Sequence, residues 1–172
     1  MEAELGERPL GERFVATWRR VLTDPHGFFA DMPQTGGLPE PTAFLAVSAA
    51  VNAAGHLLVG WGVRGMLGVF VGQVVGAFIA AAAFVLIAQN LFDGRAGFEP
   101  TFRVVAFAAA PLVLFWVPLV GVVAWLYMAY LLVRGLEQVQ AIDATRAVLT
   151  VLLGLGALWL LRAARAGGPV WF

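Results

Sequence analysis

Ser48, Asn52 and His56 are polar residues inside an otherwise apolar stretch, and their types and spacing could support chemistry. They follow one another at intervals of four residues, which places them along one side of a helix. In a bilayer such groups must contact protein or water, because an unpaired polar group in hydrocarbon is costly. The pattern indicates a polar path or small-solute site with His56 as proton acceptor, or hydrogen bonds between packed helices. Gln73, in the next apolar stretch, is expected to contact these residues.

A row of small residues, Gly68, Gly72, Gly76 and Ala80, repeats every four positions in the same apolar stretch as Gln73. Small residues at this spacing let two helix backbones approach closely in a membrane. We therefore predict a helix-packing ridge, which packs either within the chain or between chains.

Asn90, Asp93, Arg95 and Arg103 gather around the polar segment that follows this stretch. The cluster is predicted to lie at a cytoplasmic mouth. There it forms a docking surface, an anion site near a helix start, or a solvated loop with snorkelling side chains.

Several kinds of site are excluded by residue type and spacing. The chain has no cysteine, and its two histidines, His26 and His56, have no metal-ligand spacing between them. The G-x-G-x-x-G pattern at Gly60–Gly65 ends an apolar helix instead of following a strand, and the absence of lysine excludes a Walker motif. We predict no catalytic, cofactor or metal site, and a protein that is not an enzyme.

Composition places most of the chain in lipid. Of 172 residues, 60 % are hydrophobic and 13 % are charged, and the mean hydropathy is +0.83. A soluble domain of this size has too little interior to hide so much apolar surface. The formal net charge of zero speaks against a nucleic-acid partner. All 11 basic residues are arginine, a usage typical of a GC-rich bacterial genome.

Uncharged stretches predict an all-α integral membrane protein with five transmembrane helices, at about 43–63, 66–92, 101–117, 119–138 and 144–164. The segment 104–133 is ambiguous, because its 30 uncharged residues are fewer than the roughly 40 that two spans need. We interpret it as a hairpin in which Pro111 kinks the first helix. The domain organisation is then a cytoplasmic segment at 1–41, a membrane domain at 42–166 and a tail at 167–172.

The segment before the first span carries short amphipathic helices. Phe14 and Trp18 belong to an apolar stripe at helical spacing, and Phe28 and Phe29 follow in a second short helix that Asp24 caps. These four aromatic residues are predicted anchors at the membrane interface. The alternative is that the same stripe docks on the membrane domain.

Most arginines lie on the side of the N-terminus when five spans are drawn. The excess of positive charge on cytoplasmic loops then places the N-terminus in the cytoplasm and the C-terminus outside. Four spans give the same charge balance, so the arginines alone leave the number of spans open. The expected location is the bacterial inner membrane.

The order of features resembles the Yip1 domain family. The segment Trp18–Pro25 and Phe28-Phe29 are similar to the region before the first span in bacterial members, and Gly94–Gly121 continues the likeness with Pro111 and Pro118. The resemblance implies five spans with the C-terminus outside. Eukaryotic members work in vesicle traffic and contact small prenylated GTPases, but their Asp-Leu-Tyr-Gly motif is not visible here. The resemblance therefore implies a fold more than a function.

These patterns favour a membrane adaptor or organiser that acts through protein–protein or protein–lipid contacts. Its expected partners are the lipid bilayer and either a second copy of the chain or another membrane protein. The alternative is a small-solute or ion transporter or channel that uses the polar side of the first span. A proton-coupled pump fits less well, because such pumps usually carry buried Asp or Glu within the spans.

Overall fold

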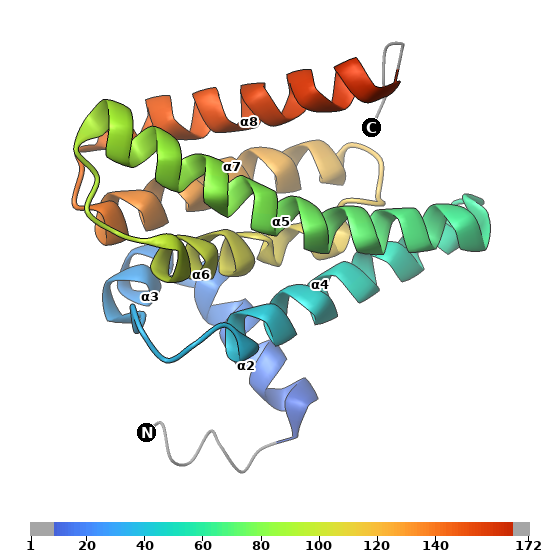
Figure 1. Cartoon of the computed structure of the whole chain (residues 1–172). Coiled ribbons are helices and arrows are strands. Elements are labelled where there is room, and N and C mark those ends of the chain that lie inside the picture. Colours follow the sequence, from blue (N-terminus) through green and yellow to red (C-terminus); the bar gives the residue numbers. More distant parts are fainter. Residues whose placement is uncertain (1–8, 167–172) are drawn as a thin grey trace.

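A computed structural model describes residues 9–166, and helices are the regular structure throughout that range. The predicted tail, 167–172, and the first eight residues of the predicted N-terminal segment lie outside the described part. The elements are shown in Figure 1 and are α2 (Leu10–Thr23), α3 (Pro25–Asp31), α4 (Pro39–Leu58), α5 (Gly62–Phe92), α6 (Phe98–Ala108), the 3-10 helix η1 (Ala110–Leu114), α7 (Val120–Gln140) and α8 (Ala144–Ala166).

The long helices lie side by side, and the chain runs between the same two ends of the bundle five times (Figure 1). One end, here named the Arg103 end, holds the start of α4 and the loops between α5 and α6 and between α7 and α8. The opposite end, here named the His56 end, holds the α4–α5 turn and the segment between η1 and α7. Both names are used below for the two halves of the bundle.

Within residues 9–166, four helices are long and apolar enough to cross a membrane: α4, α5, α7 and the Ala144–Leu161 part of α8. The prediction of an all-helical membrane protein is confirmed. The observed starts and ends move by a few residues, most of all for the first predicted span, 43–63, which is α4 at Pro39–Leu58.

The third predicted span, 101–117, is not a single helix. α6 ends at Ala108, and η1 continues from Ala110 with Pro111 in its first turn. The expected kink at Pro111 is thus a break, because proline has no amide hydrogen and its ring clashes with the preceding turn. At about 1.5 Å per residue for α6 and about 2.0 Å for η1, the two pieces cover roughly 26 Å. They therefore match the hairpin interpretation, with α7 returning beside them.

Protein surrounds α6 on every side, whereas Leu114 at the end of η1 is 43 % exposed. All residues from Thr101 to Ala108 are buried, whereas a lipid-facing helix would leave one side exposed. α6 contacts α4, α5 and α7. A break in the helical hydrogen bonding is tolerated at membrane depth where protein replaces lipid as the neighbour.

The N-terminal helices pack directly on the membrane bundle. The Phe14 ring lies 4.9 Å from the Phe44 ring, and the Trp18 indole donates a hydrogen bond to the Ala110 carbonyl at 2.8 Å. Phe28 and Phe29 in α3 are only 8 % and 2 % exposed. Phe14 and Trp18 thus contact the bundle, as the alternative interpretation of their stripe expected, whereas Phe28 and Phe29, expected to reach the membrane interface, are enclosed by protein.

Candidate functional site: a groove and an aromatic cavity at the His56 end

The predicted polar residues of α4 and α5 meet in space. The Asn52 side-chain amide donates to Gln73 Oε1 at 2.9 Å, which joins the two helices. Asn52 Oδ1, Gln73 Nε2 and the Ser48 hydroxyl have no hydrogen-bond partner within the described residues. Since Ser48 and Asn52 are 0 % and 4 % exposed, these groups have exchanged water for a protein environment that leaves them unpaired.

His56 lies one turn beyond Asn52 and has a defined proton position. Its Nδ1 lies 2.9 Å from the Asn52 carbonyl oxygen, and a carbonyl oxygen only accepts, so Nδ1 carries the hydrogen. In the neutral ring Nε2 is therefore a hydrogen-bond acceptor. The ring also packs edge-on against Trp61, with 4.9 Å between the centroids.

The predicted ridge is uncovered in the chain. A Cβ atom added at Gly68, Gly72 or Gly76 would meet nothing within 4 Å. Only Ala80, 7 % exposed, packs into the core. Among residues 9–166, these three glycines make no such intrachain packing contact, which was one of the two expected possibilities.

Gly68 and Gly72 instead line an open groove of about 560 Å³, together with both amide side chains and His56. Named here the ridge groove, it has the lining Asn52, His56, Trp61, Gly65, Gly68, Val69, Gly72, Gln73, Leu112, Phe115, Trp125 and Met128.

Other glycines of the bundle are in tight contact, which sequence reasoning missed. An added Cβ would overlap the Trp116 indole at Gly55, the Val104 side chain at Gly135 and the Phe84 ring at Gly154. Each glycine therefore allows a neighbouring side chain to lie directly on a helix backbone. Gly55 and Gly135 have no glycine four residues away, so the repeat that signals a ridge was absent.

A second cavity, of about 460 Å³, adjoins the ridge groove at the His56 end. Because aromatic rings form much of its wall, it is named here the aromatic cavity. The lining residues are His56, Val59, Trp61, Phe115, Trp116, Val117, Pro118, Leu119, Gly121, Val122 and Trp125. His56 lines both spaces and is the polar side chain that connects them.

Arg103, predicted at an open mouth, is buried instead at 2 % exposure. Its guanidinium donates to the Gly37 carbonyl at 3.0 Å and lies 3.5 Å and 3.8 Å from the carboxylates of Glu40 and Glu99. Glu99 in turn accepts from the Gly37 amide at 2.6 Å. Arg103 therefore holds the loop before α4 against α6, a structural role that its charge alone did not reveal.

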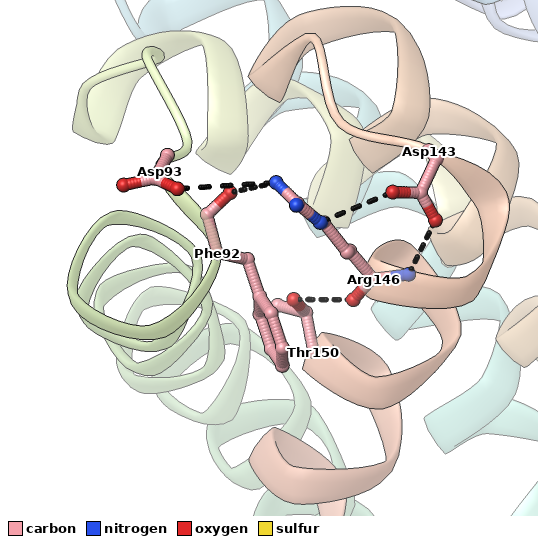
Figure 2. A network of polar contacts seen from close by, with 5 residues as sticks. All are labelled: Phe92, Asp93, Asp143, Arg146 and Thr150. Atoms are coloured by element: carbon pink, nitrogen blue, oxygen red, sulfur yellow. Dashed lines mark hydrogen bonds and ion pairs between the residues drawn. The ribbon is translucent and has the colours of Figure 1, made fainter.

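The other three residues of the predicted mouth lie apart from Arg103. Figure 2 shows Arg146 between Asp93, the Phe92 carbonyl and Asp143, with separations of 3.9, 3.3 and 3.1 Å. These contacts tie the end of α5 to the start of α8. Asn90 bonds the Leu86 carbonyl of its own helix, and Arg95 is exposed. The four residues therefore do not form one site.

Comparison with known proteins identifies the family of this chain. The family description of the Yip1 domain matches residues 19–163, which is most of the chain. The chain belongs to the Yip1 domain family. No curated protein and no solved structure matches it significantly. Family membership and the apolar helices together make this Yip1 domain chain a multi-pass membrane protein.

Gln140 is the main polar residue of this Yip1 domain that sequence reasoning missed. It is fully buried at the end of α7, accepts from the Ala96 amide at 3.0 Å and donates to the Thr101 hydroxyl at 2.9 Å. It thus positions the α5–α6 loop. Its place at the edge of an apolar segment resembled an ordinary exposed helix end, so the sequence carried no distinct signal.

Among the described residues of the Yip1 domain, no three His, Asp or Glu side chains come close enough together to hold a metal ion. The ridge groove and the aromatic cavity are lined by uncharged residues, apart from the titratable His56. Their lining suits binding by shape and hydrogen bonds more than by charge.

Proposed function

We propose that this Yip1 domain protein is a non-enzymatic membrane adaptor that binds a transmembrane helix of another membrane protein in the ridge groove. The observation that carries the proposal is the uncovered row Gly68, Gly72 and Gly76. In a membrane, helices associate through close packing on small residues and through hydrogen bonds between helices. The ridge allows close packing, and the unpaired amide groups of Asn52 and Gln73 allow hydrogen bonds between helices.

The surroundings of the ridge support a membrane-embedded partner. Leu67, Val71 and Val75 flank it on α5 and are 53 %, 54 % and 49 % exposed. An apolar helix can therefore lie along α5 on these residues, with the exposed Arg64, one turn before Gly68, at the end of the contact. A polar side chain on that helix, opposite Gln73, would supply the missing hydrogen-bond partners.

One observation favours transport as a second candidate: Asn52, His56 and Gln73 line the same groove. A transport path needs polar groups along the whole crossing, and the row on α4 ends at Ser48, which is fully buried. Transport by this route predicts that His56→Leu abolishes solute flux into liposomes while the fold survives. Unchanged flux removes His56 from any such path.

The orientation belongs to the same proposal. With the Arg103 end in the cytoplasm, the loops rich in arginine face the inside, as the positive-inside rule requires. The N-terminus is then cytoplasmic and the C-terminus outside, in the inner membrane of a bacterium. Cysteine labelling checks this directly, because the natural chain has no cysteine. Gly97→Cys should be protected from an impermeant reagent, and Gly60→Cys should react.

Site-specific photo-crosslinking in native membranes tests the adaptor role. A photoreactive residue at Val69, which lines the ridge groove, should capture a foreign membrane protein. The same residue at Leu86, exposed near the other end of α5, should capture mainly lipid. Capture of a second copy of this chain, or of lipid alone, from Val69 contradicts the proposal.

A matched pair of substitutions sharpens this experiment. Gly72→Leu fills the ridge and should abolish the Val69 crosslink. Gly156→Leu makes the same change on α8, where an added Cβ also meets nothing within 4 Å, and should leave the crosslink intact. Equal crosslinking in both variants would show that the partner does not use the ridge.

A further inference from the structure

The aromatic cavity lies at the His56 end, away from the glycines of the ridge, and shares His56, Trp61, Phe115 and Trp125 with the adjoining ridge groove. Trp61, Trp116 and Trp125 line it, and Leu119 and Val122 lie at its rim with exposures of 83 % and 62 %. Because the rim is apolar and exposed on a membrane-spanning bundle, the cavity opens toward lipid. An occupant can therefore enter from the bilayer.

The cavity wall is held in place from behind. Trp116 lies against the backbone of α4 at Gly55, where a side chain would collide with it, and its Nε1 donates to the Val113 carbonyl at 3.1 Å. This indole is thus positioned without any ligand. A cavity whose walls are set in advance loses little conformational freedom on binding.

The rim contains a strained turn. Leu119 has φ +67° and ψ −47°, and the Val120 amide donates to the Pro118 carbonyl at 2.8 Å, which closes a γ-turn. This turn is rare for a residue with a side chain. Gly121 lies so close to Phe115 in space that an added Cβ would collide with the Phe115 carbonyl oxygen. The turn places the Leu119 side chain at the mouth of the cavity.

His56 is the side-chain hydrogen-bond acceptor that this cavity offers to an occupant, beside the indole N–H donors of Trp61 and Trp125. It is 6 % exposed, and its Nδ1 hydrogen is already used by the Asn52 carbonyl. Within residues 9–166 no hydrogen bond is made to Nε2. A neutral His56 therefore presents one acceptor, and the matching ligand group is a hydrogen-bond donor.

The other lining residues of the aromatic cavity determine which kind of hydrogen-bond donor a ligand can present to His56. No charged side chain lines the cavity, and a charged ligand group would have to leave water without a counter-ion. A hydroxyl donates a hydrogen bond without this cost. We propose that the aromatic cavity binds an uncharged membrane alcohol, whose hydroxyl donates to His56 Nε2 while its apolar body lies on the indoles and leaves past Leu119.

Tryptophan fluorescence tests the proposal with the purified full chain in lipid nanodiscs. The probes are a brominated long-chain alcohol, which quenches nearby indoles, and its methyl ether, which lacks the donor hydrogen. The alcohol should quench at about tenfold lower concentration than the ether, the effect expected for one net hydrogen bond. The corresponding amine and phosphate monoester should be weaker quenchers than the alcohol.

Two variants connect the preference to the cavity. His56→Phe keeps a ring but removes the acceptor, so the alcohol and the ether should become equal. Val122→Phe fills the cavity from an exposed position without adding an indole and should weaken quenching by both, with His56 unchanged. Circular dichroism and gel filtration confirm that each variant is folded.

Three results would overturn the proposal. The first is equal quenching of the natural protein by the alcohol and the ether. The second is an alcohol preference that survives in folded His56→Phe. The third is a preference for the phosphate monoester, which would mean that a protonated His56 receives an anion. Gly72→Leu should leave the alcohol preference intact, which separates this site from the ridge.

Discussion

At the Arg103 end of the bundle, buried polar side chains bond the loops that cover them, with Arg103 Nε left unpaired among the described residues, whereas at the His56 end the amide side chains bond only each other. Gln140 and Arg103 bond the loops that pass over them. Asn52 and Gln73 bond each other and keep an unpaired atom each. All glycines of α5 lie in its half nearer the His56 end, and three of them form the uncovered ridge.

This difference shows where stability and function separate in the molecule. A closed polar network and filled glycine contacts stabilise a single packing arrangement. An uncovered ridge contributes little to the isolated chain and is available to another molecule, whereas the unpaired amide atoms of Asn52 and Gln73 are buried beside it. The four predictions below test this division, beginning with the largest expected effect.

Removing Arg103 should be the most damaging single change. Arg103→Met removes the bond to the Gly37 carbonyl and leaves two carboxylates without their cation, at an expected cost of about 3 kcal/mol. Arg95→Met, in the exposed loop nearby, should stay within about 0.5 kcal/mol of the natural protein. Chemical unfolding in lipid nanodiscs measures both, and equal stabilities would contradict a closing role for Arg103.

Two glycines on α8 should respond differently to the same substitution. Gly154→Leu forces a side chain into the Phe84 ring and should cost about 2 kcal/mol. Gly156→Leu points into open space and should change the free energy of unfolding by less than about 0.5 kcal/mol. A similar change in the free energy of unfolding at both positions would show that contact with the Phe84 ring does not control the effect.

Gln140 and Gln138 give a matched test on α7. Gln140→Leu leaves the buried Ala96 amide without its acceptor, so we expect a loss of about 1.5 kcal/mol. Gln138 is exposed, and Gln138→Leu should have almost no effect on unfolding. If hydrogen exchange of the Ala96 amide is unchanged in Gln140→Leu, the network does not hold this loop.

The Asn52–Gln73 pair should contribute least. A double-mutant cycle with Asn52→Ala and Gln73→Ala should give a coupling of about 0.6 kcal/mol, the average for interhelical hydrogen bonds in a membrane protein. A coupling above that of the Gln140 network would reverse the comparison between the two ends. The cycle is measured in the same nanodiscs, without any added partner.

The positions of most long helices could be predicted from the hydropathy of the sequence. The predicted spans 66–92 and 144–164 correspond closely to α5 and α8, because an uncharged segment of sufficient length can satisfy its backbone in lipid only as a helix. Asp24 caps α3 as predicted, since its side chain accepts from the Gly27 amide. These features depend on neighbouring residues in the chain, so local patterns are enough to find them.

The candidate site was predicted only in part. The contact between Asn52 and Gln73 follows from two short periodicities on adjacent helices, and the structure has it. The grouping of Arg103 with Asp93 failed, because closeness in sequence across a loop says nothing about which way each side chain turns. The aromatic cavity was not foreseen, since its walls come from the α4–α5 turn and the η1–α7 segment, far apart in the chain.

The sequence by itself determined that most of this protein lies in lipid and that its spans are helical. A long apolar segment can bury its backbone in lipid without unpaired amides only as a helix. Tertiary structure decided which glycines are covered, which polar atoms are paired, and that α6 is enclosed by protein. Those outcomes depend on which side chain lies opposite each position. Which side chains face each other across the bundle depends on how all the helices pack together. No single segment of the sequence contains that information.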